Sequence, residues 1–271
     1  MPQFLQILGV ILLSVALKSC WHPALRKLGS LMVLLASFLI GYHLTAHWET
    51  GLFCALSWFF LPWLELLTRV RRMRLSLDHP LTRRFPPSRD HFPMLPELSA
   101  ELEDAGFDRV ADTGWEWEGQ SQFIRLFGKP DEAVRAAITL VEQDDFLFFY
   151  VSFTSRGTDG TLWTTWNYPF SDSMKLPPVV RLNRVRGEET VAGLLERHRQ
   201  FLQREAVSRE QLSPVDPETL ETETERELNA QIAHNVRIGV FLPADEGKVR
   251  YSWRGLLFIW CQFLRDFVRL S

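Results

Sequence analysis

The sequence has little cysteine and no recognisable catalytic or nucleotide-binding motif. Its 271 residues include three cysteines, and none forms a C-x-x-C pair, which argues against a disulfide scaffold and a cysteine-based metal site. The motifs G-x-x-x-x-G-K-[ST], G-x-G-x-x-G, G-x-S-x-G and H-E-x-x-H are all missing, so the common phosphate, dinucleotide, hydrolase and zinc-protease signatures do not apply. We therefore expect no cofactor and no metal, and an enzymatic role stays open without being favoured.

Acidic residues are scarce in the first part of the chain. Residues 1–74 contain seven Lys or Arg and two acids, Glu49 and Glu65, whereas residues 75–271 contain 23 bases and 31 acids. The net charge of −3 and the mean hydropathy of −0.07 are therefore averages over two unlike parts. The acidic part has no basic patch interleaved with its aromatic residues, so we expect no nucleic-acid partner.

Three uncharged apolar stretches predict a transmembrane anchor over residues 1–74, with helices at about 3–20, 28–48 and 50–68. A helix needs roughly 20 apolar residues to cross about 30 Å of hydrocarbon. The alternatives are a soluble three-helix bundle and a lipoprotein signal ending at Cys20. The stretches are apolar all round, which disfavours the bundle, and the first three residues lack the basic start of a secretory signal.

The basic residues of the anchor predict its orientation. They fall into two tracts, one after the first helix and one after the third: Lys18, Arg26 and Lys27, then Arg69, Arg71, Arg72 and Arg74. The positive-inside rule places both tracts, and everything after residue 68, in the cytoplasm. We expect a protein of the inner (cytoplasmic) membrane with its N-terminus outside, its main domain inside, and membrane lipid as a partner.

The remainder of the chain divides into a linker, a domain and a final helix. Four prolines and three arginines make residues 75–94 an irregular linker, which either follows an anionic leaflet or is simply solvated. Residues 95–250 predict a cytoplasmic α+β domain, an antiparallel meander of four or five strands with helices on one face. Its expected strands are 107–111, 122–127, 134–141, 146–154 and 161–167; its expected helices are 96–105, 188–205 and 218–236, followed by a short edge strand at 238–242. The first strand is expected to end at a turn formed by Asp112, Thr113 and Gly114.

The last segment, residues 251–271, predicts an amphipathic helix. Ten uncharged residues at 255–264 are too few to span a bilayer. Apolar residues recur every three or four positions, so we interpret it as an interfacial helix with Trp253 and Trp260 at the membrane interface. The alternative is a helix that docks on the sheet or on the anchor.

An aromatic group is the best candidate for a ligand site, namely Trp115, Trp117, Trp163, Trp166 and Tyr168. On one sheet face these side chains would line a pocket for an apolar ligand. The alternative, which we favour, is that they are ordinary sheet core, since aromatic side chains bury the most area.

The histidines and acids provide weaker hypotheses. His43 and His47 are four residues apart, but two histidines without a third ligand are a poor metal site. His198 lies on the apolar stripe of its helix and is more typical of a satisfied, half-buried histidine than of a base. An unrecognised enzyme would use Asp159, His198, Glu116 or Asn167.

Four runs in the chain resemble uncharacterised bacterial membrane-anchored proteins. They are GFDRVADTGWEWEGQSQFIRLF, FFYVSFTSRGTDGTLWTTWNYPF, LLERHRQFL and VRYSWRGLLFIW, and together they extend over most of residues 95–262. The resemblance implies one domain continuous with the last helix and carries no activity. Our leading hypothesis is a membrane-anchored module that binds a protein partner or ligand at the membrane face; the alternatives are lipid or hydrophobe binding by an aromatic sheet pocket, and an unrecognised enzyme.

Overall fold

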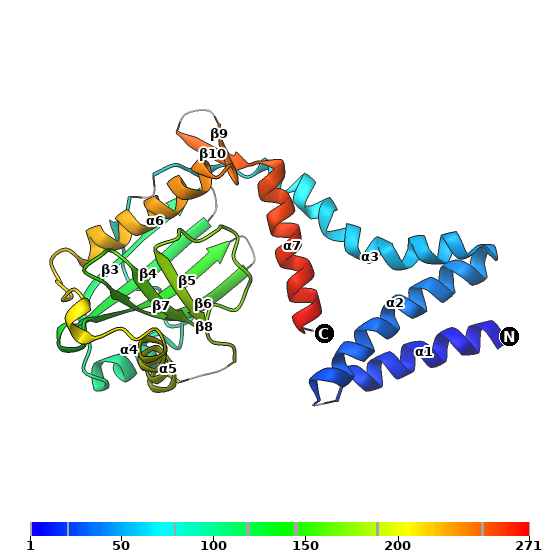
Figure 1. The fold of residues 1–271 in the computed structure, drawn as a ribbon, viewed down its shortest axis with the longest axis horizontal. Coiled ribbons are helices and arrows are strands. Elements are labelled where there is room, and N and C mark those ends of the chain that lie inside the picture. Colours follow the sequence, from blue (N-terminus) through cyan, green and yellow to red (C-terminus); the bar gives the residue numbers. More distant parts are fainter. Residues whose placement is uncertain are drawn as a thin grey trace.

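The structure is a computed structural model, and it describes residues 2–20, 22–78, 80–117, 120–143, 146–187, 190–244 and 247–270. It has the α+β architecture that the sequence predicts, with apolar N-terminal helices and a mostly antiparallel sheet. Figure 1 shows the sheet and its helices at one end of the molecule and the N-terminal helices at the other, with the last helix between them.

The N-terminal helices are α1 (Pro2–Lys18), α2 (Pro23–Thr45) and α3 (Trp48–Thr68). By length and apolar composition α2 and α3 could each cross a membrane, while α1 is shorter. Helix α2 begins earlier than predicted because His22 caps it, its Nδ1 accepting a hydrogen bond from the Ala24 amide at 3.3 Å. It also ends earlier, since Ala46 takes a left-handed conformation with φ 59°.

Small residues let these helices pack closely. A Cβ on Gly51 would lie 2.8 Å from the Phe38 carbonyl oxygen, and one on Gly41 would lie 3.0 Å from the Cα of Gly51. Between α1 and α2, the Ser14 hydroxyl donates to the Gly29 carbonyl at 2.8 Å. Close approach at small residues and interhelical hydrogen bonds are typical of helix packing in membranes.

The main sheet contains β2 (Thr82–Arg83), β3 (Asp108–Trp117), β4 (Gln120–Lys129), β5 (Val134–Gln143), β6 (Phe146–Arg156), β7 (Leu162–Trp166) and β8 (Val180–Arg184) in that spatial order. All neighbours are antiparallel except β7 and β8, which are parallel. The sheet therefore exceeds the predicted four or five strands. The arginine-rich β8 was missed, as was β2, which lies inside the segment predicted as an irregular linker.

The length predicted for the first long strand, residues 107–111, is also wrong, because β3 is ten residues long. The triplet from Asp112 to Gly114 was predicted to be a turn, but the strand continues through it. Asp112 accepts two hydrogen bonds from Arg125 on β4, at 2.8 and 2.9 Å. Gly114 is required because a Cβ there would lie 1.9 Å from the Gln122 carbonyl oxygen, so the glycine marks close backbone approach rather than a turn.

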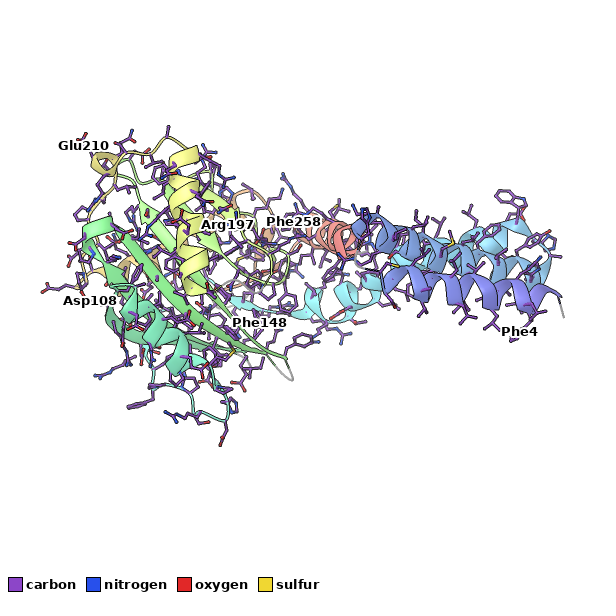
Figure 2. All side chains as sticks on the ribbon, turned by 90° about the horizontal axis from the view of Figure 1, so that it is seen from below. Phe4, Asp108, Phe148, Arg197, Glu210 and Phe258 are labelled. Atoms are coloured by element: carbon purple, nitrogen blue, oxygen red, sulfur yellow. The ribbon has the colours of Figure 1, made fainter. Side chains whose placement is uncertain are left out.

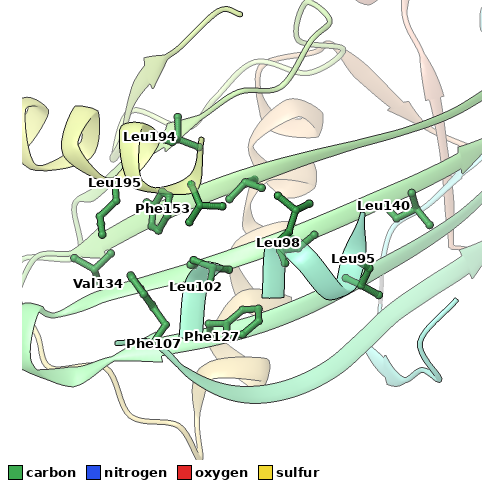
Figure 3. Packing of buried hydrophobic residues seen from close by; sticks show 14 of the residues in the cluster. Leu95, Leu98, Leu102, Phe107, Phe127, Val134, Leu140, Phe153, Leu194 and Leu195 are labelled. Carbon is green, nitrogen blue, oxygen red and sulfur yellow. The ribbon is translucent and has the colours of Figure 1, made fainter. Parts of the chain in front are cut away.

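One face of the sheet carries the main core under α4 (Leu95–Asp104) and α5 (Val191–Arg204). Figure 3 shows leucines of both helices over phenylalanines of the strands. The buried side chains include Leu102, Phe107, Phe127, Phe153 and Leu194. Val151 and Phe153 of β6 both enter this core from alternate positions, as the two-residue period of a strand requires.

The opposite face is covered in part by α6 (Leu220–Arg237), which contradicts the prediction that helices cover one face only. Leu220 packs on Ile124 and Leu126 of β4. Glu227 of α6 pairs with both Arg135 of β5 and Arg156 of β6. The apolar content of α6 is thin, as the sequence shows, and ion pairs supplement it in docking the helix.

A second core joins the N-terminal helices to the sheet domain. It contains the end of α3, the end of α6, the small sheet β1–β10–β9 and the final helix α7 (Trp253–Leu270). The strands are β1 (Leu75–Ser76), β9 (Phe241–Pro243) and β10 (Lys248–Tyr251), so the predicted strand at 238–242 is shifted and belongs to this separate sheet. Leu66 of α3 is fully buried there.

Candidate functional site

Six aromatic side chains gather on the part of the sheet that α6 leaves uncovered. We call them the aromatic cluster: Phe146, Phe148, Tyr150, Trp166, Tyr168 and Phe170. Three come from alternate positions of β6 and three continue the alternation out of β7, so strand geometry brings them to one face. Ring centroids lie 4.9 Å apart for Phe148–Phe170 and 5.1 Å apart for Tyr150–Tyr168.

An arginine closes one side of the cluster. The guanidinium of Arg184 lies 5.8 Å from the ring centroids of both Trp166 and Tyr168 and pairs with Asp172 at 2.5 Å. Burial, with lesser contributions from nearby charges, raises the pKa of Tyr168 to about 12. Burial also raises the pKa of Tyr150, opposed by hydrogen bonds with Thr139 and Gln122. Both phenols therefore stay protonated at neutral pH and are unsuited to act as bases.

The cluster becomes more exposed toward the N-terminal helices. Phe146 is 62% exposed and Phe170 is 43% exposed, whereas Tyr150 and Trp166 are partly enclosed. Figure 2 places Phe148 at the end of the sheet domain nearest the N-terminal helices, with Asp108 and Glu210 at the far end. The exposed apolar rim of the sheet therefore lies on the side of the N-terminal helices.

Helix α7, which lies between the sheet and the N-terminal helices, adds a second exposed apolar surface. Its inner side docks through the buried residues Leu256, Ile259 and Gln262. Its outer side exposes apolar residues at helical spacing, which we call the outer stripe: Trp253, Leu257 and Cys261, with Leu264 partly exposed. The sequence left open whether this helix docks or lies at an interface; one side docks, and the other remains exposed.

The predicted interfacial tryptophans differ in their surroundings. Trp253 is exposed, and the Arg71 guanidinium lies 4.5 Å from its ring centroid. Trp260 docks on α3, where its indole N–H donates to the Phe59 carbonyl at 2.8 Å and its ring lies 6.0 Å from that of Trp63.

The two basic tracts lie at the same end of the N-terminal helices. Lys18, Arg26 and Lys27 flank the connection between α1 and α2, and Arg69, Arg71, Arg72 and Arg74 follow α3. Figure 1 shows that the α1–α2 connection and the end of α3 both face the sheet domain, whereas the α2–α3 connection lies at the opposite end.

The five predicted ligand-binding residues are separated by the fold. Trp166 and Tyr168 are in the aromatic cluster, but Trp163 projects from the opposite face, where its ring packs on Gly157. Trp115 shares the cluster's face on β3, several strands away across the sheet. The side chain of Trp117 lies outside the described residues.

Arg184, Asp172 and Phe170 were missed by the sequence analysis. The continued alternation of aromatic residues at 166, 168 and 170 is a signal for Phe170. Nothing local indicates that the arginine of a parallel edge strand would reach Trp166.

His198 is a structural residue, fully buried rather than half-buried as predicted. Its Nε2 lies 3.1 Å from the Ser155 hydroxyl and its Nδ1 lies 3.1 Å from the Thr165 hydroxyl. Burial, reinforced by the charge of Arg199, lowers its pKa to about 4. The neutral ring thus links α5 to β6 and β7.

The other residues named for an enzyme have separate contacts. Asp159 accepts hydrogen bonds from Thr161, Glu116 pairs with Arg84, and the Asn167 side chain accepts from the Val151 amide. No pair among Asp159, His198, Glu116 and Asn167 is joined by a hydrogen bond described in the structure. The acid–base pairing that this hypothesis requires is therefore without support.

The described residues hold no group of three potential metal ligands. His43 is in α2, but His47 lies beyond the left-handed Ala46, just before the start of α3, so the two histidines do not share a helix face. Comparisons with protein-family models, curated proteins and solved structures found no significant match. The resemblance to uncharacterised bacterial membrane-anchored proteins stays a prediction.

Proposed function

We propose that the protein is a membrane-anchored module that binds a protein partner or ligand at the membrane face. In this proposal α1, α2 and α3 form a three-helix anchor in the inner membrane, with the N-terminus outside and the sheet domain in the cytoplasm. The observation that carries it is that two exposed apolar surfaces, the rim of the aromatic cluster and the outer stripe of α7, belong to the parts of the molecule nearest the N-terminal helices.

The anchor is supported by composition, packing and charge. Residues such as Leu12, Phe53 and Leu64 expose large apolar surface that lipid would cover. The short α1 is extended toward the interface by Lys18, whose long side chain can snorkel. With both basic tracts at the domain end, the positive-inside rule puts that end in the cytoplasm.

The binding surface is supported by its exposure. Phe146, Leu147 and Phe170 form an apolar edge at the anchor end of the sheet, and such edges are typical of interaction sites. Arg184 fills the space over Trp166 and Tyr168, which disfavours a deep pocket within the cluster. The geometry therefore favours contact across a surface.

Site-specific photo-crosslinking tests this surface. A photoreactive phenylalanine analogue replaces Phe170 in the full chain in native membranes, and another replaces Glu210 at the far end as the control. We expect a discrete protein or lipid adduct from position 170 and none from position 210. Equal labelling at both positions would contradict a membrane-face binding surface.

Cysteine labelling tests the membrane contact of α7. Cys261 is exposed on α7, so a spin label on it, with Cys20 and Cys54 replaced by serine, reports the surroundings of that face. We expect greater access to lipid-soluble oxygen than to a water-soluble nickel complex. A label on Glu210→Cys in the cysteine-free chain provides the aqueous reference, and matching values would show that α7 faces water.

Lipid or hydrophobe binding is the second candidate, and the exposed rings of Phe146 and Phe170 favour it. Native mass spectrometry of the full chain released from mild detergent would show a retained lipid. The variant Phe146→Ser with Phe170→Ser is expected to lose it. Identical lipid content in this variant and the wild type would remove this candidate.

A further inference from the structure

We infer that the open edge of β8 is a docking site for an extended segment of a partner protein in which acidic and apolar residues alternate. β8 is the last strand of the main sheet, and among the residues that the structure describes no further strand pairs with its outer edge. Figure 1 shows β8 beside α5. This edge is separate from the rim of the aromatic cluster, so the inference does not depend on the function proposed above.

The register between β7 and β8 identifies the backbone groups at the open edge. The Leu162 amide donates to the Val179 carbonyl at 2.9 Å, and the Val185 amide donates to the Trp166 carbonyl at 2.9 Å. Odd-numbered residues of this segment therefore face β7, because the N–H and C=O of one residue point to the same side and successive residues alternate. The even-numbered residues, with Leu182 at the centre, direct their backbone groups outward.

Such an edge is a template for another strand. Within the described ranges, the Leu182 backbone has no hydrogen-bond partner across the edge. Exposed backbone donors and acceptors of this kind pair with extended chains, and strand addition is a recurring mode of peptide recognition. Two copies of β8 paired edge to edge would bring their arginines together, which is unfavourable, so we expect a different chain as the occupant.

The two faces of β8 present different side chains. On the α5 face, Arg181 is exposed, and Arg204 of α5 donates a hydrogen bond to an asparagine of the strand at 3.3 Å. On the opposite face, Leu182 is half-buried, and Arg184 is already paired with Asp172 beside the aromatic cluster. The α5 face is therefore basic, whereas the opposite face is apolar with its one cation neutralised.

This difference between the faces specifies the occupant. Side chains of an added strand alternate between the two faces, so acids suit the α5 face and apolar residues the other. Carboxylates on the α5 face would meet Arg181 and Arg204 in charge-assisted hydrogen bonds. A cleft of about 330 Å³ between the end of β8 and α5, lined also by Gln200, gives these side chains room. Residues 180–186 contain three arginines and no acid, so the charge of the edge favours an acidic segment.

Fluorescence polarisation of a labelled peptide with the full chain in mild detergent tests the site. The probe is an octapeptide of alternating glutamate and valine, the control peptide has lysine in place of glutamate, and detergent without protein gives the background. We expect saturable binding of the glutamate peptide and at least about tenfold weaker binding of the lysine peptide, because like charges repel at this edge. Equal affinities of the two peptides, or no binding of the glutamate peptide, would overturn the proposal.

Two N-methylated forms of the glutamate peptide test whether it adds as a strand. One is methylated on every glutamate nitrogen and the other on every valine nitrogen, so each lacks one set of alternate N–H donors. A strand presents only one set to its neighbour, so one form is expected to bind at least about tenfold more weakly than the other. Loss in the glutamate-methylated form indicates parallel addition, and loss in the valine-methylated form indicates antiparallel addition. Equal affinity of the two forms would show that the peptide is not added to the sheet.

Charge reversal in the protein provides the matched test. Arg181→Glu changes an exposed side chain of β8, and we expect it to weaken binding of the glutamate peptide about five- to tenfold and to strengthen binding of the lysine peptide. The control is Arg83→Glu, an exposed arginine of β2 at the other edge of the same sheet, for which we expect an affinity within about twofold of the wild type. Equal effects of the two variants would place the peptide elsewhere and overturn the proposal.

The variant Leu182→Pro removes an outward N–H while leaving the hydrogen bonds with β7, so we expect it to abolish peptide binding. Thermal unfolding without peptide is measured for every variant, so that loss of binding is separated from loss of fold. If Leu182→Pro does not fold, Arg181→Glu and the methylated peptides decide the outcome. If the wild type forms a dimer in analytical ultracentrifugation that Arg181→Glu abolishes, the occupant is a second copy of this chain, and the proposal of an acidic partner segment is wrong.

Discussion

At the scale of single residues, the buried imidazole of His198 is the clearest case of a polar group that serves stability. Its two nitrogens have hydroxyl partners on neighbouring strands, so the neutral ring is satisfied, and burial disfavours the charged ring. Its lowered pKa is therefore a consequence of burial rather than a sign of catalysis. In the aromatic cluster, the Arg184 guanidinium likewise serves the fold. It lies beside the rings of Trp166 and Tyr168, where a cationic ligand would otherwise bind.

His198 predicts a pH dependence of folding. The unfolded imidazole gains a proton near pH 6.5, but the folded one, with a pKa of about 4, does not. Stability is therefore constant above about pH 6.5 and falls as the pH drops toward 4, by about 2 kcal/mol between pH 7 and pH 5. We expect His198→Gln to remove most of this slope in denaturant unfolding of the full chain in detergent.

Glu132 provides the internal check on that experiment. Its hydrogen bond with Arg199, together with Lys129, lowers its pKa to about 2. The stability that it contributes is lost only below its unfolded pKa of about 4.5, so it leaves the window from pH 7 to pH 5 unaffected. Equal pH slopes for the wild type and His198→Gln in that window would contradict the assignment.

At the scale of elements, glycines decide how the N-terminal helices pack. Gly51 contacts Phe38 across the α2–α3 interface, whereas a Cβ on Gly9 of α1 would have no atom within 4 Å. Alanine is favoured over glycine in a helix by about 1 kcal/mol. We expect Gly9→Ala to raise or leave unchanged the thermal unfolding midpoint in detergent and Gly51→Ala to lower it. A rise in both would show that α2 and α3 do not meet at Gly51.

Helix α7 makes a second prediction at this scale, because adjacent leucines face different surroundings. Leu256 is 0% exposed and Leu257 is 48% exposed. Truncating a fully buried leucine typically costs about 2–5 kcal/mol, and truncating an exposed one costs far less. We expect Leu256→Ala to destabilise the chain strongly in denaturant unfolding while Leu257→Ala changes it by less than about 1 kcal/mol. Similar losses would mean that α7 is docked in another rotation.

At the scale of the whole molecule, the second core packs the N-terminal helices against the sheet domain. Leu66 of α3 is buried beside α6 and α7, and Trp260 bonds to the backbone of α3. The sheet domain is therefore held beside the N-terminal helices by packing as well as by residues 75–94. This arrangement keeps the rim of the aromatic cluster on the side of those helices.

The proposed topology is testable with reporter fusions. The basic tracts predict that the α2–α3 connection lies outside and the C-terminus inside. We expect a fluorescent protein fused after Ser271 to be fluorescent in the cytoplasm, and a phosphatase inserted between Ala46 and His47 to be active only in the periplasm. Phosphatase activity from a fusion at Ser271 would reverse the orientation.

The spacing of apolar residues along the sequence was sufficient to predict the apolar N-terminal helices, most strands and the apolar stripe of α5. These features follow from the spacing of apolar residues, which burial and backbone geometry impose on the chain itself. The predicted length of β3 was too short because Gly114 was interpreted as a turn residue. This glycine is instead needed for close approach to the Gln122 carbonyl of the next strand, which the local sequence does not show.

Features that join distant segments needed the tertiary structure. The chain does not indicate that α6 crosses to the second face, because the acids that dock it meet arginines about 70–90 residues away. Nor does it separate Trp163 from Trp166, although three residues put them on opposite faces of β7.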